Sequence, residues 1–278
     1  MKYPNDYIYK YKKYEIPKKD FYNKKVLFVF GDSWTNNRYV DEPKKHWCYL
    51  LKEKLNYDLV VNISDNYDSN YEIFDCVKKT LSDKDYPMNQ QSYLNKLKEF
   101  KVVVDWSTPM RDSTSVAEMY SPWNTATIPD LDSKEPNTKL WLDYVDKWFR
   151  VEMYSYDTQK RILFLQEFFN HNKIDWYMFM GFTPLVEKQF HNTKYDLRKW
   201  IDKERFLFLY GFPNNMQDYL ITTLDKKFKE DIDINEMQFE NNRLKYFGSH
   251  SNDVFTCDGH PDTKGLELMS DMIYRSIK

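Results

Sequence analysis

The stretch VLFVFGDSWT, Val26 to Thr35, decides the fold. Five apolar residues in a row predict a strand that is buried on both faces, as strands in parallel sheets are. The run ends at Gly31, one of only 6 glycines in the chain, and Asp32 and Ser33 follow it. The stretch therefore raises a question: Ser33 is either a nucleophile at the end of a buried strand or a polar residue in a turn.

Strands and helices are predicted to alternate along the rest of the chain. The apolar patterns predict further strands at 58–64, 101–107, 174–182 and 205–212, and helices at 45–55, 70–81, 91–100, 138–172 and 263–277. Such an alternation is typical of a parallel sheet whose right-handed crossover connections place helices on both faces. The expected fold is α/β, a three-layer α/β/α sandwich with a parallel sheet of about five strands.

The chain is predicted to form one domain, at 25–278, preceded by an N-terminal arm. Residues 1–24 alternate Lys and Tyr without a clear period, and we interpret them as an arm that lies on the domain or on a partner. Two insertions are expected, at about 111–137, which is polar and broken by three prolines, and at about 228–257. Loops of this length are usually functional or mobile.

Composition excludes several classes of protein. With 41 basic and 43 acidic side chains, the formal net charge is −2, so no nucleic-acid partner is expected. The three cysteines are far apart, and no disulfide framework, metal site or cofactor is predicted. No segment has the apolar core of a signal peptide or the length of a membrane span, which favours a cytoplasmic location.

Four segments carry a family resemblance. Gly31-Asp32-Ser33 after the first strand and Asp258-Gly259-His260-Pro261 before the last helix resemble the motifs of the SGNH/GDSL hydrolase family. VVNISDNYDSNYEIF resembles the second block of that family. VVVDWSTPMR resembles the third block of its phage-type branch, in which W-[ST]-x-x-x-R replaces G-x-N-D. The resemblance implies a flavodoxin-like sheet and the hydrolysis of esters, often lipid esters or acetyl groups on sugars.

The resemblance also implies catalytic roles for Ser33 and His260. Ser33 would be the nucleophile, and a serine hydroxyl needs an adjacent base to attack at neutral pH. His260 would take the Ser33 proton and return it to the leaving alcohol. The alternative roles are structural, with Ser33 as the N-cap of a helix and His260 as a loop residue that caps the last helix.

The orienting acid departs from the family pattern. The family places an Asp three residues before the His, where this chain has Cys257, and the nearest acid is Asp258, two residues before. Either Asp258 reaches the imidazole, or a backbone carbonyl orients the ring and the site is a Ser–His dyad. Asp262 is a weaker candidate and is expected to cap the final helix.

The oxyanion site departs from the pattern too. The Ser33 N–H can contribute, but the glycine that supplies the family's second donor is replaced by the Asn66-Tyr67-Asp68 loop, so the backbone around Tyr67 would have to serve. Ser107 or Thr108 stands where the family has an asparagine. Losing one such donor costs about 3 kcal/mol of transition-state stabilisation.

Two further residues lie near this site. Arg111 either compensates as a cation beside the oxyanion or substrate, or forms a surface salt bridge. Asn70 either donates to the loop or caps helix 70–81, and the cap is the preferred interpretation. Four aromatic residues could stack on sugar rings, although core packing is expected because aromatics make up 18% of the chain: Trp34, Trp106, Tyr120 and Trp123.

The sequence thus predicts a serine ester hydrolase acting on an acyl or O-acetyl ester of a small molecule or glycan. The alternative is a weak or inactive structural or interaction protein of the same fold, such as a phage virion component. A homo-oligomer or assembly into a virion, with a virion location if the chain is phage-encoded, stays open. A nucleotide-binding function is disfavoured because no glycine-rich phosphate loop follows the first strand.

Overall fold

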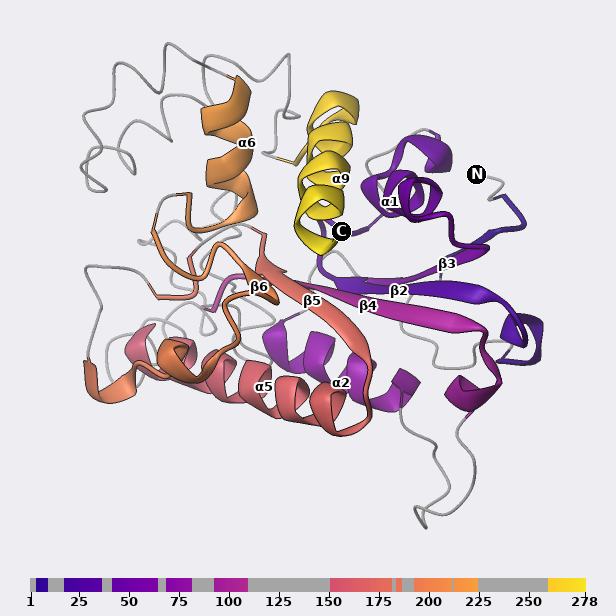
Figure 1. The fold of residues 1–278 in the computed structure, drawn as a ribbon. Helices are drawn as coiled ribbons and strands as arrows, with labels where there is room; N and C mark the ends of the chain where they lie inside the picture. Colours follow the sequence, from indigo (N-terminus) through magenta and orange to yellow (C-terminus); the bar gives the residue numbers. More distant parts are fainter. Residues whose placement is uncertain are drawn as a thin grey trace, which may run out of the picture.

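A six-stranded parallel sheet runs through the centre of the molecule (Figure 1). In this computed structural model the described residues are 4–9, 18–36, 42–64, 69–81, 93–109, 151–181, 184–186, 193–211, 213–224 and 260–278. Both expected insertions, at 111–137 and 228–257, lie outside these residues.

Each of the five predicted strands is present in the sheet, and residues 7–9 add a sixth. The strands are β1 (Tyr7–Tyr9), β2 (Lys25–Gly31), β3 (Leu59–Ser64), β4 (Glu99–Trp106), β5 (Asp175–Met180) and β6 (Phe206–Leu207). They lie in the order β1-β3-β2-β4-β5-β6, and every neighbouring pair is parallel. The chain direction across the sheet reverses between β3 and β4, which puts the expected ligand crevice at the carboxyl ends of β2 and β4.

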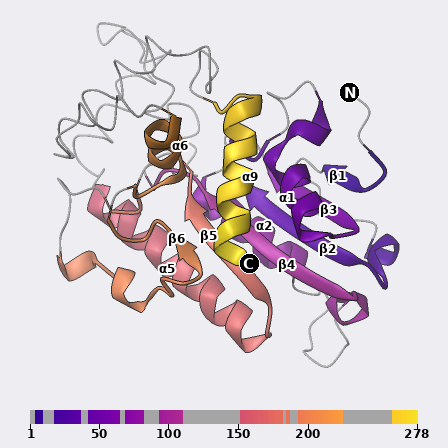
Figure 2. The ribbon, with the colours of Figure 1, turned by 45° about the horizontal axis from the view of Figure 1, so that its top comes forward.

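Helices cover both faces of this sheet, which confirms the three-layer sandwich. On one face lie α1 (Trp47–Leu55), α6 (Met216–Leu224) and α9 (Thr263–Ile277); on the other lie α2 (Asn70–Leu81) and α5 (Val151–His171) (Figures 1 and 2). In both views α9 stands between α1 and α6. Short 3-10 turns are η1 (Lys18–Phe21), η3 (Pro43–Lys45), η4 (Tyr93–Lys96), η7 (Thr193–Tyr195) and η8 (Arg198–Trp200).

The strands divide their side chains between two cores. Successive residues of a strand point to opposite faces. Phe28 and Phe30 of β2 therefore pack toward α2 and α5, whereas Leu27 and Val29 pack toward α1 and α9. All four are fully buried, so both faces contribute to the hydrophobic stabilisation of the fold.

The helix predicted at 91–100 is wrong. Residues Tyr93–Lys96 form only a 3-10 turn, and β4 begins at Glu99. Strand pairing overrides the helical pattern, because Lys98 N–H donates to the Lys24 carbonyl (3.0 Å) and the Glu99 carboxylate accepts from Tyr57 Oη (2.8 Å). Glu99 also forms an ion pair with Lys25, at the start of β2 (2.9 Å).

The boundaries of the other predicted elements were close, with one exception, and β1 and α6 were not predicted at all. Helices 70–81 and 263–277 begin and end as predicted, and α5 covers 151–171 of the region predicted at 138–172, whose residues 138–150 lie outside the described chain. The last predicted strand shrinks to Phe206–Leu207, and helix α6 was not predicted. Phe208, directly after β6, has φ 65°, a left-handed conformation that a strand cannot continue through.

The N-terminal arm contributes β1 to the sheet edge beside β3 (Figure 2). Tyr7 pairs with Val60, and Tyr9 pairs with Asn62. An ion pair between Asp6 and the buried Lys52 of α1 holds the arm from the side, and Tyr49 Oη also donates to Asp6 (3.2 Å). Residues 7–9 are therefore a strand of the central sheet.

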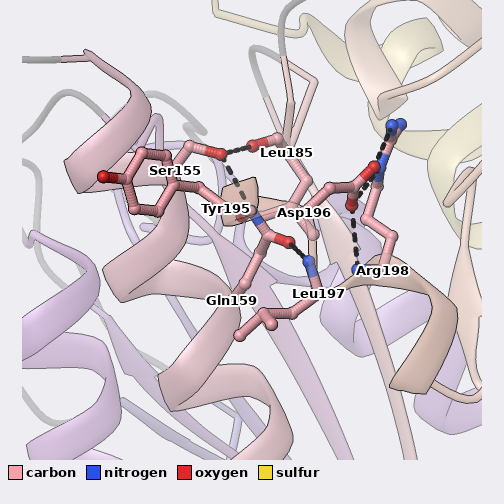
Figure 3. Close-up of polar contacts among 7 residues, drawn as sticks. All are labelled: Ser155, Gln159, Leu185, Tyr195, Asp196, Leu197 and Arg198. Atoms are coloured by element: carbon pink, nitrogen blue, oxygen red, sulfur yellow. Dashed lines mark hydrogen bonds and ion pairs between the residues drawn. The ribbon is translucent and has the colours of Figure 1, made fainter. Parts of the chain in front are cut away.

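Polar side chains of α5 hold the irregular chain that follows β5 (Figure 3). Gln159 Oε1 accepts from Leu197 N–H (2.6 Å), and Gln159 Nε2 donates to the Tyr195 carbonyl (3.3 Å). Ser155 Oγ donates to the Leu185 carbonyl (2.6 Å). These bonds supply backbone partners for the described residues Leu185, Tyr195 and Leu197, which a strand ladder would otherwise have supplied.

Candidate active site

Ser33 lies in the turn that follows β2. Asp32 Oδ1 accepts from Trp34 N–H (3.1 Å), and Thr35 N–H donates to the Asp32 carbonyl (3.1 Å). The next helix, α1, begins at Trp47 and is capped by His46. Ser33 therefore caps no described helix, and its side chain lies in a buried turn with 4% of its surface exposed.

The glycine before this turn is required by close packing. A Cβ at Gly31 would lie 2.4 Å from Thr35 Oγ1 and 2.9 Å from Asp105 Cβ, far inside contact distance. A Cβ at Gly181, directly after β5, would lie 2.7 Å from Asp105 Oδ1. Two of the chain's few glycines thus make room for the Asp105 carboxylate at the end of β4.

Asp105 and Asn62 form the buried polar frame of the turn. Thr35 Oγ1 donates to Asp105 Oδ2 (2.8 Å), and Asn62 Nδ2 donates to the Thr35 carbonyl (2.6 Å). Asn62 Nδ2 also donates to Tyr7 Oη (2.8 Å), while Asn62 Oδ1 accepts from Ser64 Oγ (2.8 Å). Asp105 and Asn62 are both fully buried, so these bonds fix the backbone on which Ser33 sits.

His46 and Cys48, near this frame, have structural roles. His46 is fully buried, and its Nδ1 accepts from Cys48 N–H (3.3 Å) as the cap of α1. Burial lowers the pKa of His46 to about 3, so its imidazole is neutral at pH 7. Burial, and then the charge of Asp105, raise the pKa of the Cys48 thiol, which keeps it unreactive.

The start of α9, just after His260, lies at the same edge of the sheet as Ser33. Helix α1 follows β2, so its last residues return to the amino ends of the strands. Lys54 at that end forms an ion pair with Asp271 in the second half of α9 (3.2 Å). The two packed helices therefore run in the same direction, and α9 begins at the carboxyl edge.

His260 does not cap α9. Asp262 Oδ1 accepts from Lys264 N–H and Gly265 N–H, both at 3.0 Å, so Asp262 is the N-cap as predicted. His260 is half-buried, and both of its ring nitrogens are buried. The helix-capping role that competed with catalysis for His260 is thereby filled by another residue.

Asn70 does not cap α2, contrary to the preferred interpretation. Ser69 is the cap: its Oγ accepts from Glu72 N–H (3.3 Å), and the Glu72 carboxylate accepts from Ser69 N–H (2.8 Å), a reciprocal capping box. This frees the Asn70 amide for the segment after β4. Asn70 Nδ2 lies 3.0 Å from the Ser107 carbonyl and 3.2 Å from the Thr108 carbonyl.

The structure therefore brings three of the predicted residues together: Asn70, Ser107 and Thr108. All three are buried. Ser107 Oγ and Asn70 Oδ1 have no hydrogen-bond partner among the described residues. Buried polar atoms of this kind are uncommon and need a reason, such as a ligand or ordered water.

Several predicted residues lie outside the described chain. These are Tyr67, Arg111 and Asp258 of the site, and Tyr120 and Trp123 among the aromatics. Trp34 and Trp106 are described and are core residues, with 1% and 0% of their surface exposed. Their role is packing, as expected for most aromatics in this chain.

Sequence reasoning missed the polar frame of Asn62, Asp105, Thr35 and Gly181. A signal for it exists in the alternation of the strands. In LVVNIS and VVVDW, a polar residue interrupts an otherwise apolar strand two positions after a valine of the α1/α9 face. A polar residue at such a position is buried, and a buried polar residue must be bonded.

The described residues contain no group of three or more His, Cys, Asp or Glu side chains that could hold a metal ion. Within the same ranges, no helix is long and apolar enough to cross a membrane.

The comparisons with known proteins give likenesses of fold only. No protein family model and no curated protein match the sequence. Among solved structures, a lipolytic protein of the G-D-S-L family from Desulfitobacterium hafniense DCB-2 is 14% identical, with a TM-score of 0.45 over 91% of this chain and 99% of that chain.

Two more solved structures are similar to this chain. A member of the lipolytic protein G-D-S-L family from Veillonella parvula DSM 2008 is 11% identical, with a TM-score of 0.35 over 90% of this chain and 97% of that chain. The acetyl xylan esterase AlAXEase is 14% identical, with a TM-score of 0.43 over 91% of this chain and 100% of that chain. These are proteins of the kind that the sequence motifs resemble. The fold assignment itself rests on the strand order and the two helical layers, because likenesses of this size add no argument.

Proposed function

We propose that this protein is a serine ester hydrolase that removes an acyl or O-acetyl group from a small molecule or glycan. The observation that carries the proposal is the position of two segments in the fold. The turn of Ser33 and the start of α9, which follows His260, lie at one edge of the sheet, beside the point where the strand order reverses. Neither residue is the cap of the helix that follows it, since His46 and Asp262 fill those roles.

In the proposed reaction Ser33 Oγ attacks the ester carbonyl carbon while His260 accepts the hydroxyl proton. The tetrahedral intermediate then loses the alcohol, which takes that proton from His260. Water attacks the acyl-enzyme, gives a proton to His260, and the acid leaves as Ser33 regains its hydroxyl. Asp258 would orient the imidazole.

The proposed oxyanion donors are the Ser33 and Tyr67 backbone N–H groups and the hydroxyl of Ser107 or Thr108, with Arg111 as a nearby cation. The Ser107 hydroxyl supports this assignment, because none of the described residues forms a hydrogen bond with it and it can donate to a ligand. Asn70 supports it indirectly: its bonds to the Ser107 and Thr108 carbonyls fix the segment that carries both hydroxyls.

The test is hydrolysis of 4-nitrophenyl acetate together with covalent labelling by a fluorophosphonate. Wild type is expected to give both, and Ser33→Ala and His260→Ala are expected to lower the hydrolysis rate by about a thousandfold or more. Ser276→Ala, which removes an exposed hydroxyl of α9, is the matched control and should leave the rate unchanged. Equal rates for wild type and Ser33→Ala would contradict the proposal and favour a non-catalytic structural or interaction protein.

The same assay separates a triad from a dyad. If Asp258 orients the imidazole, Asp258→Asn is expected to lose nearly as much activity as His260→Ala. A far smaller loss for Asp258→Asn would show that a Ser–His dyad carries the reaction.

A further inference from the structure

A pocket lies beside the candidate site, on the opposite helical layer from α9. It has a volume of about 280 Å³, just below the ~300–1,000 Å³ typical of ligand pockets. Its walls include Asn70 and Tyr71 at the start of α2, Pro109 just after β4, and Asp157 and Arg161 of α5. Asn70 and Pro109 follow the two strands that flank β2, so the pocket opens at the edge of the sheet that carries Ser33.

The walls combine polar, aromatic and apolar groups. Of the nine described residues that line the pocket, five carry a charged, amide or aliphatic hydroxyl group, two are tyrosines, and Pro109 and Met153 are apolar. A site for a long acyl chain would be lined by aliphatic side chains. An aromatic face combined with charged and amide groups instead suits a sugar ring, which has apolar C–H faces and hydroxyls around its edge.

The hydrogen-bonding groups of the pocket are held in place before any ligand binds. Arg161 forms an ion pair with Asp157, and its guanidinium lies 5.5 Å from the centre of the Tyr71 ring. Arg161 is three-quarters buried, while Tyr71 remains about half exposed at the rim. An arginine guanidinium carries five N–H donors, more than one ion pair uses, so donors remain for the hydroxyls of a ligand.

The wall next to the candidate site holds an unused acceptor. Asn70 exposes only 2% of its surface, and its Nδ2 bonds to the Ser107 and Thr108 carbonyls and to Thr158 Oγ1 (3.2 Å). Its Oδ1 has no partner among the described residues. Asn70 thus joins the segment with the proposed oxyanion donors to the pocket and leaves one acceptor for a ligand hydroxyl.

We infer that this pocket binds one sugar residue of the substrate, next to the ester that Ser33 attacks. The inference rests on the proposed hydrolase function and adds to it the class of the alcohol part, a glycan. It assigns Arg161, Asp157 and Tyr71 to recognition of that sugar.

The test compares the hydrolysis of two kinds of ester by wild type and by Arg161→Gln. The probes are 4-nitrophenyl acetate, which has no sugar, and O-acetylated trisaccharides of xylose, mannose and N-acetylglucosamine. A charge-assisted hydrogen bond is worth about 1.5–3 kcal/mol, so kcat/KM for the best trisaccharide should fall about tenfold or more in Arg161→Gln. The rate with 4-nitrophenyl acetate should change less than about twofold.

Arg198→Gln is the matched control. Arg198 also forms an ion pair with an aspartate, Asp196 (2.9 Å; Figure 3), and also lies over a tyrosine ring, that of Tyr210 (5.4 Å), but it does not line the pocket. This substitution should change neither rate. An equal loss for the two arginine variants, or an equal loss of Arg161→Gln on both esters, would overturn the inference.

Failure of the inference and failure of the hydrolase proposal give different results. Ser33-dependent hydrolysis of 4-nitrophenyl acetate, with no acetylated trisaccharide hydrolysed, would overturn the sugar pocket and leave the hydrolase standing. If no ester is hydrolysed, calorimetric titration with the unacetylated trisaccharides tests the pocket alone. Binding that weakens about tenfold in Arg161→Gln would uphold it, and absence of binding to all three would overturn it.

Discussion

The two faces of the sheet differ most at the carboxyl ends of the strands. On the face toward α2 and α5, the strands remain apolar up to their carboxyl ends, where the residues are Phe30, Ile63, Trp106 and Met180. Toward α1 and α9 the corresponding positions are Gly31, Asn62, Ser64, Asp105 and Gly181. One face is thus a continuous hydrophobic core, and the other ends in a buried hydrogen-bonded frame around the turn of Ser33.

This difference separates a face held by apolar packing from a face whose strand ends are held by directed hydrogen bonds. Apolar packing tolerates small shifts, because it has no direction. A buried polar frame fixes a single backbone path, because every group in it must keep its partner. The face that holds the frame is also the face on which α9 packs, after His260.

The largest expected effect belongs to the apolar face. Phe30→Ala removes a fully buried ring and should lower the free energy of unfolding by about 3–5 kcal/mol, measured by urea denaturation. Phe164→Ala, at a 54% exposed position of α5, is the control and should cost less than about 1 kcal/mol. Similar losses for both variants would show that the apolar face is not the main source of stability.

Removing one bond from the polar frame should have the next largest effect. Thr35→Val keeps the side-chain volume but takes away the hydroxyl that donates to Asp105, which should cost about 3 kcal/mol of unfolding free energy. Thr35→Ser retains the hydroxyl and should lose clearly less. A Ser variant as unstable as the Val variant would mean that packing, and not this hydrogen bond, holds the turn.

The smallest predicted effect is a pH dependence from His46. Its pKa is about 3 in the folded state and 6.5 in the unfolded chain, so acid protonates the unfolded chain first. The stability that comes from keeping His46 neutral is fully present above pH 6.5 and is lost as the pH falls toward 3. The free energy of unfolding should therefore fall by about 2 kcal/mol between pH 7 and pH 5.

His46→Asn is the variant that isolates the pH dependence caused by His46. Asparagine can still cap α1 but does not titrate, so the difference in unfolding free energy between pH 7 and pH 5 should shrink by the same amount. An unchanged slope in His46→Asn would contradict the buried neutral imidazole.

The fold was predictable from the sequence because its main signals are local. Apolar runs such as Val26–Phe30 mark strands buried on both faces, and the helical period marks α2 and α9. The failures have tertiary causes. Residues 91–100 read as a helix, but pairing beside β2 makes Glu99 the start of a strand.

The candidate site was predictable only in part. The motifs point to Ser33 and His260, and the cap at Asp262 follows from residue type and position. The Asn70 contact was not predictable, because its partners lie 37 and 38 residues away after another strand. Capping by Ser69 could have been found from the S-x-x-E spacing of Ser69 and Glu72.

The tie between the N-terminal strand and the turn of Ser33 has a practical consequence. Asn62 donates both to Tyr7 Oη and to the Thr35 carbonyl. A single residue therefore links the N-terminal strand β1 to the turn of Ser33. Removing the first nine residues for expression would expose the edge of β3 to solvent. It would also remove the hydrogen bond between Asn62 and Tyr7 Oη. An affinity tag is therefore better attached after Lys278, because α9 runs from the edge that carries the turn toward the amino ends of the strands.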